Sequence, residues 1–120
     1  MGDFRTLLFY KKAFDNAMMI FQITKDFPRE EKYALTTQMR NSSRSVCANI
    51  AEGYRKRDYV NHFVSKLTDA DMENSETIVW IDFALACGYI TLDVHKKLIA
   101  SFEEVGRMLS HAIRNPDKFL

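Results

Sequence analysis

One stretch of the chain repeats its apolar and small side chains in alternating steps of four and three residues. The members of this seam are Phe63, Leu67, Ala70, Asn74, Thr77, Ile81 and Ala84. Such spacing places all of them on one face of a helix, and it is typical of the contact line between helices in a left-handed bundle. The surrounding helix is predicted to run from about residue 59 to 87, about 43 Å long at about 1.5 Å per residue.

Three further segments show apolar residues at helical spacing. They run from about 5 to 26, where Pro28 blocks continuation, from about 29 to 52, and from about 92 to 114. Only four glycines and two prolines interrupt a chain that is 47% apolar, which favours a helical protein. Because the connections are short, neighbouring helices should run in opposite directions. We therefore predict one all-α domain over residues 1–120, an antiparallel up-down-up-down four-helix bundle.

Four residues are candidates for helix ends. Gly53 suits the left-handed position that follows a helix, so it is predicted to end the second helix. Asp58 is predicted to cap the third helix, and Gly88 to end it. Thr91 is predicted to cap the fourth helix.

The first predicted helix is apolar almost all round over residues 17–23. A helix at the edge of a monomeric bundle should instead be polar on its outer face. Single exposed apolar residues are common, but a contiguous run is more typical of a contact surface. We therefore expect this helix to be covered twice, by its own bundle and by a second copy of the chain.

Charge is segregated along the chain although the net charge is only +1. Residues 29–57 hold seven lysines and arginines against three glutamates, whereas residues 58–88 hold one lysine against six carboxylates. Neighbouring helices of opposite sign attract one another, within one chain or between copies, and a basic face can still remain on one side.

The basic residues are the best functional lead in the sequence. Guanidinium and ammonium groups neutralise phosphates, and the tyrosines that flank the second basic cluster, Tyr54 and Tyr59, could stack on unpaired bases. The alternative is an ordinary solvated loop, since the sequence pI of about 7.8 is low for a nucleic-acid binder. The candidate nucleic-acid contacts are Arg40, Arg44, Arg55, Lys56 and Arg57.

Three carboxylates share one face of the third predicted helix, namely Asp69, Glu73 and Glu76. A di-iron bundle could use such a face, but it also needs Glu-x-x-His motifs, and the chain contains none. The three histidines lack the spacing of metal ligands. We therefore expect no metal, and expect these carboxylates to pair with arginines such as Arg40 and Arg44 on a neighbouring helix.

Asn49 and Glu52 lie where a helix normally buries apolar side chains, on one face with Ser45. They could be a catalytic acid and its orienting partner, but no activated nucleophile or strained Gly-x-Ser-x-Gly turn accompanies them. Buried polar groups at a helix end more often fix the register of packing. We therefore expect a structural role for them, and a protein that is not an enzyme and uses no cofactor.

The sequence also bears on location. No apolar run approaches the roughly 20 residues that span a bilayer, and the start lacks the order of a signal peptide. Cys47 and Cys87 lie on separate predicted helices without CxxC spacing, as expected of free thiols in a reducing compartment. We therefore expect a cytoplasmic protein without a membrane partner.

The segment Ser45-Val46-Cys47-Ala48-Asn49-Ile50-Ala51-Glu52-Gly53 resembles the four-helix-bundle family of bacterial intervening-sequence proteins. These proteins are encoded in insertions of large-subunit ribosomal RNA genes and have been labelled ribosomal-protein-like. Glu73-Asn74-Ser75-Glu76-Thr77 and Cys87-Gly88-Tyr89-Ile90 are similar to one branch of the family. The resemblance covers roughly residues 6–114.

The resemblance implies a bundle that assembles as a homopentamer. It extends to the accessory protein of diversity-generating retroelements, a more basic pentamer that binds nucleic acid and a reverse transcriptase. Asn49, Glu52 and Gly53 match the strongest positions of the family, where they look structural. The five candidate arginines and lysine match positions that are often basic.

From these observations we expect a non-enzymatic bacterial oligomer that binds nucleic acid, most simply structured RNA, through its phosphates. The alternative is a protein-interaction scaffold with no nucleic-acid role, whose partner could be a reverse transcriptase or another protein.

Overall fold

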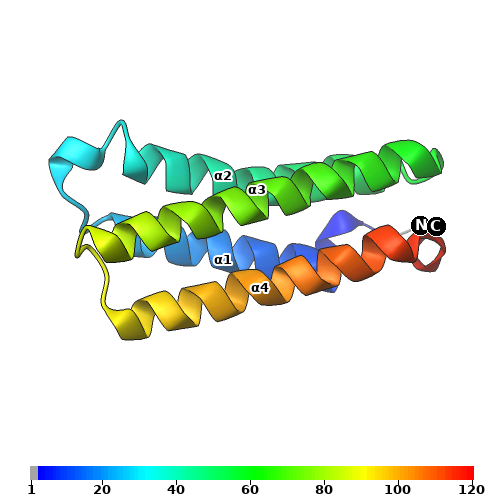
Figure 1. Ribbon diagram of the computed structural model, residues 1–120. Coiled ribbons are helices and arrows are strands. Elements are labelled where there is room, and N and C mark those ends of the chain that lie inside the picture. Colours follow the sequence, from blue (N-terminus) through cyan, green and yellow to red (C-terminus); the bar gives the residue numbers. More distant parts are fainter. Residues whose placement is uncertain (1–2) are drawn as a thin grey trace.

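The computed structural model describes residues 3–120, so the first two positions of the predicted domain lie outside the described residues. Four long helices lie side by side along the length of the molecule, which measures 44 × 24 × 20 Å (Figure 1). The helices are α1 (Leu8–Thr24), α2 (Leu35–Arg55), α3 (Val60–Ala86) and α4 (Leu92–Arg114), with short 3-10 turns η1 (Phe4–Thr6), η2 (Arg29–Glu31) and η3 (Pro116–Phe119). No strand occurs over residues 3–120, so the all-α prediction is confirmed.

The core consists of two apolar clusters that lie one after the other along the bundle. One cluster, at the end near both chain termini, includes Phe9, Ile50 and Phe63. The other, at the opposite end, includes Ile20 and Met39. All seven seam residues predicted for α3 are buried, because helical periodicity assigns one face of this long helix to the core.

A buried polar layer separates the two clusters. In it Thr77 Oγ1 lies within hydrogen-bond distance of both Ser42 Oγ, at 2.7 Å, and the Glu73 carbonyl oxygen, at 2.9 Å. The Asn74 side chain donates to the carbonyl of Phe102 on α4 at 2.8 Å. Among the described residues, no buried side-chain nitrogen or oxygen lacks a partner. A satisfied polar layer of this kind favours one register, since sliding a helix would leave these groups unpaired.

The α2–α3 connection differs from the prediction at two positions. Gly53 lies inside α2 and is buried, whereas a left-handed conformation was predicted for it. Glycine serves packing there instead of ending the helix, since a Cβ atom on Gly53 would lie 2.9 Å from Cβ of Lys66 on α3. Asp58 does not cap α3, because Tyr59 occupies the N-cap position and makes no side-chain cap hydrogen bond.

The α3–α4 connection follows the prediction. Gly88 has a φ angle of +77° and is the only residue with a positive φ over positions 3–120. Its N–H donates to the Leu85 carbonyl, and the Tyr89 N–H donates to the Ala84 carbonyl, both at 2.9 Å, which together form a Schellman ending. Thr91 then caps α4, where its Oγ1 accepts the Val94 N–H at 3.2 Å.

The beginning of α2 also differs from the prediction, which started this helix at residue 29. The structure has the separate turn η2 there, and α2 begins only at Leu35 because the N-cap residue Ala34 has non-helical backbone angles. The Glu31 carboxylate accepts the Leu35 N–H at 3.3 Å and the Tyr89 hydroxyl at 2.7 Å. A contact with the distant α3–α4 connection therefore accompanies this helix start.

Candidate nucleic-acid interface

A hollow of about 760 Å³ opens at one end of the bundle. Both ends of the chain lie at this end of the bundle (Figure 1). The hollow lies where α2 ends and where the chain begins, so it combines residues that are about fifty positions apart. We call it the basic hollow. Its lining residues are Asp3, Phe4, Arg5, Arg55, Arg57, Asp58 and Leu120. Two of the predicted nucleic-acid contacts, Arg55 and Arg57, therefore lie in one concave site.

Arg57 is held in place by its neighbour Tyr54. The guanidinium of Arg57 lies 4.1 Å from the centre of the Tyr54 ring and donates a hydrogen bond to the Tyr54 carbonyl at 2.9 Å. Tyr54 is itself buried, so its ring supports Arg57 and is not free to stack on a base. Tyr59 is 67% exposed and keeps that possibility. Lys56, at the C-cap position of α2, is exposed.

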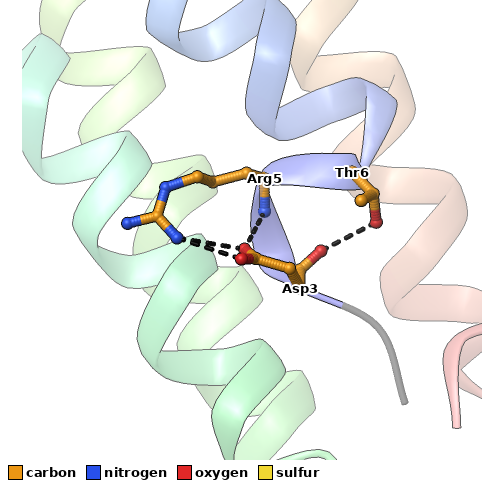
Figure 2. Close-up of polar contacts among 3 residues, drawn as sticks. All are labelled: Asp3, Arg5 and Thr6. Atoms are coloured by element: carbon orange, nitrogen blue, oxygen red, sulfur yellow. Dashed lines mark hydrogen bonds and ion pairs between the residues drawn. The ribbon is translucent and has the colours of Figure 1, made fainter.

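Arg5 is the residue that sequence reasoning missed. Its guanidinium lies 4.5 Å from the centre of the Phe4 ring and is paired with Asp3, which comes just before η1. Figure 2 shows the Asp3 carboxylate turned toward Arg5, while the Asp3 backbone carbonyl accepts the Thr6 hydroxyl. Nothing in the spacing of Arg5 connects it with Arg55, because the two meet only through the folding of the terminal segment onto the bundle end.

The structure does not bring Arg40 and Arg44 to the basic hollow. Both lie against Phe21 on α1, with guanidinium carbons 4.8 and 5.9 Å from the ring centre. Arg40 is half-buried, and its Nε donates to Thr24 Oγ1 at 2.8 Å, whereas Arg44 is exposed. Arg44 precedes Arg55 by eleven positions, which separates them by about 16 Å along the helix axis. The five candidates therefore form two groups.

The expected pairing of α3 carboxylates with Arg40 and Arg44 is wrong for the described residues, whose ion pairs involve other partners. Those pairs are Asp3–Arg5, Lys12–Glu104, Glu52–Lys66 and Asp82–His95. Burial, followed by the charges of Glu76 and Asp69, raises the pKa of Glu73. No group of three potential metal ligands occurs in the described part of the chain.

Asn49 and Glu52 are less buried than the sequence suggested. The Asn49 side chain is half-buried and donates to the Ser45 carbonyl of its own helix at 2.9 Å. Glu52 is 60% exposed and pairs with Lys66 on α3 at 2.9 Å, and this hydrogen bond and charge raise the pKa of Lys66. An exposed pair of this kind contributes little to stability. Within the Asn49–Gly53 segment, Gly53 is the residue whose small size the packing requires.

Comparison with known proteins explains the resemblance noted in the sequence. A family model described as 23S rRNA-intervening sequence protein matches residues 5–111. The chain belongs to this family. It is also similar to a crystal structure of a protein with unknown function from the S23 ribosomal protein family of Bacteroides thetaiotaomicron. That structure has a TM-score of 0.80 and 23% identity, with 90% of this chain and 96% of the other covered.

The structural likeness establishes the shared helical fold. No curated protein matches the chain. Within residues 3–120, no helix is both long and apolar enough to cross a bilayer.

Proposed function

We infer that this intervening-sequence protein is a non-enzymatic protein that binds structured RNA through its phosphates, at the basic end of the bundle. The observation that carries this proposal is the basic hollow, which Arg55 and Arg57 line together with Arg5 from the beginning of the sequence. Planar guanidinium groups suit phosphate oxygens, to which they can donate two parallel hydrogen bonds. Lys56 extends the same basic end over the exposed surface.

The choice of RNA rests on the family, which is named for an intervening sequence of 23S rRNA. Charged contacts outnumber groups that could read base edges. We therefore expect RNA affinity to depend steeply on salt concentration and little on base sequence. Arg44 offers a second exposed contact on the side of the bundle. Arg40 is the weakest of the five candidates, because its guanidinium already engages Thr24 and Phe21.

We further propose that the bundle is antiparallel and assembles as a homo-oligomer, a pentamer by resemblance. Support for the antiparallel order comes from facing pairs: Gly53 lies against Phe63, and Ser42 contacts Thr77, so positions rise on α3 as they fall on α2. Several copies would present several basic ends to one RNA, and the phosphate contacts would then add through avidity.

Binding to a hairpin from large-subunit ribosomal RNA, followed by fluorescence anisotropy at several salt concentrations, tests the function. We expect affinity to fall steeply with salt in the wild type, and the double variant R55E/R57E to bind at least tenfold more weakly. The matched control is K25E/K96E, which makes the same charge change at the opposite end of the bundle. Equal losses in the two variants would mean that the basic hollow is not the contact site.

A protein-interaction scaffold is the second candidate, with a reverse transcriptase among the conceivable partners. It is favoured by an apolar groove of about 320 Å³ between α2 and α3, lined by residues that include Leu35, Trp80 and Phe83. Phe83 is half-exposed there. For this reading, affinity capture from the native cells should return one stoichiometric protein that survives nuclease treatment and is lost in the variant F83E.

A further inference from the structure

The basic hollow contains anions of its own. Besides its three arginines it is lined by Asp3 and Asp58, so its charged side chains carry a net charge of only +1. Asp3 makes direct contact with one of these arginines, whereas the other two, Arg55 and Arg57, form no ion pair in the described structure. The carboxylate of Asp3 thus lines the same hollow as the three guanidinium groups that would attract a phosphate.

The Asp3 carboxylate uses the donors that a phosphate would use. Its Oδ1 accepts the backbone N–H of Arg5 at 2.8 Å and an Nη1 hydrogen at 3.2 Å, while Oδ2 lies 3.1 Å from the same Nη1 (Figure 2). The hydrogen bond from the Arg5 backbone, with the charges of Arg5 and then Arg55, lowers the pKa of Asp3. Asp3 is therefore negatively charged at neutral pH and lies within the field of both arginines.

The ion pair between Asp3 and Arg5 can be replaced by a contact between Arg5 and a phosphate. The side chains of Arg5 and Asp3 are 68% and 52% exposed, and exposed ion pairs of this kind are weak. The backbone hydrogen bond to Oδ1 does not depend on the guanidinium, so Arg5 can leave Asp3 while the η1 turn stays capped. Stacking against Phe4 limits the positions of the Arg5 side chain near the hollow.

We propose that the basic hollow binds one phosphate group of the nucleic acid between Arg5, Arg55 and Arg57, and that Asp3 is its built-in competitor. In the free protein the Asp3 carboxylate occupies the guanidinium of Arg5. A backbone phosphate carries one negative charge, as the Asp3 carboxylate does, but it is not tethered to Arg5, so it takes over this guanidinium and gains Arg55 and Arg57 as well. Asp3 therefore lowers affinity for isolated anions and for weakly placed phosphates. This inference rests on the proposed RNA function.

The variant D3N tests the competitor, because asparagine keeps the helix-capping oxygen and removes only the charge. We expect D3N to bind the RNA hairpin about two- to fivefold more tightly, the range that loss of an exposed ion pair allows. The matched control is D117N, an exposed aspartate of η3 at the same end of the bundle that does not line the hollow. An equal increase in RNA affinity in D117N would overturn the proposal, because it would show that any lost negative charge at this end of the bundle has the same effect.

The double variant D3N/R5Q shows whether the gain passes through Arg5. We expect D3N to raise affinity less in the R5Q background than in the wild type, since Asp3 then only repels the phosphate and no longer occupies a guanidinium. A gain from D3N that is equally large in the R5Q background would overturn the proposal.

A titration with inorganic phosphate, followed by the NMR signal of the Arg5 side-chain N–H, separates this proposal from the RNA function. If no variant binds RNA, the proposed function fails, and the titration alone decides the role of Asp3. Tighter phosphate binding by D3N than by wild type and D117N supports the competitor, and equal binding overturns it.

Discussion

Cys47 is a single residue whose chemistry follows from its position on α2. It is buried against the core cluster near the chain termini. Burial raises the pKa of the Cys47 thiol from 9.0 to about 11, because the thiolate is poorly solvated there. The folded protein therefore keeps this proton at pH values where the unfolded chain loses it.

The sign of the resulting pH dependence follows from linkage. Between pH 9 and 11 the unfolded state binds fewer protons at Cys47, so its contribution lowers the free energy of unfolding as pH rises above about 9. We expect the free energy of unfolding of the wild type to exceed that of the variant C47A by about 1 kcal/mol at pH 8, where the buried sulfur packs as a neutral group. Urea unfolding should give a smaller difference in the free energy of unfolding at pH 10 than at pH 8. A difference that does not change with pH would contradict the effect of burial on the Cys47 thiol.

At the scale of the element, α2 and α3 approach each other closely beside Gly53. The nearest atoms to an added Cβ there are Lys66 Cβ at 2.9 Å and the Phe63 carbonyl oxygen at 3.4 Å. Neither atom can swing aside as the tip of a long side chain would, since one is in the backbone and the other is attached to it. Contact between the two helices therefore depends on glycine at this position.

We expect G53A to lower the free energy of unfolding by about 1–3 kcal/mol, the usual cost of overpacking, even though alanine favours helix formation. The control is G106A on α4, where the nearest atom to a new Cβ is the Asn74 amide nitrogen at 3.4 Å. G106A should be neutral or slightly stabilising in the same urea unfolding experiment. Equal effects at the two glycines would show that the α2–α3 contact yields more easily than the structure indicates.

Some features of α2 and α3 could be predicted from the sequence and others could not, because the latter depend on contacts with distant residues. The buried seam of α3 could be predicted in full because the helical period is a local property of the chain. The start of α2 could not, since Glu31 bonds with Tyr89 from a connection 58 positions away. Gly53 was misjudged for the same reason, because its close neighbours belong to another helix.

At the scale of the whole molecule, α1 leaves apolar side chains without cover. Phe14 is 49% exposed and Met18 is 44% exposed, and both line a groove with Ala48 and Ala51 of α2. Contiguous exposed apolar residues are typical of an interface. This pattern agrees with the proposal that another copy of the chain covers α1.

We expect the variant F14E to weaken assembly, because a charge at the centre of an apolar contact is poorly solvated. Light scattering after size-exclusion chromatography should give a smaller mass for F14E than for wild type at equal concentration. N61E makes the same charge change at an exposed position of α3 and serves as the control. A monomeric wild type, or an unchanged mass in F14E with native circular dichroism, would contradict the proposed oligomer.

The candidate interface was predictable in part. Arg55, Lys56 and Arg57 are contiguous, so any fold keeps them together. The sequence could not show that Arg5 joins them, nor that Arg40 and Arg44 lie beside Phe21 instead, since both depend on which segments the fold brings into contact.

The sequence by itself determined the all-α class, the four helices and the buried face of α3, because these follow from the spacing of apolar residues and from turn chemistry within a few positions. Only the tertiary structure decided the basic hollow, the polar layer between the two core clusters and the close contact at Gly53. Each of these joins residues from distant parts of the chain, and their meeting depends on how whole helices pack, which no local pattern specifies.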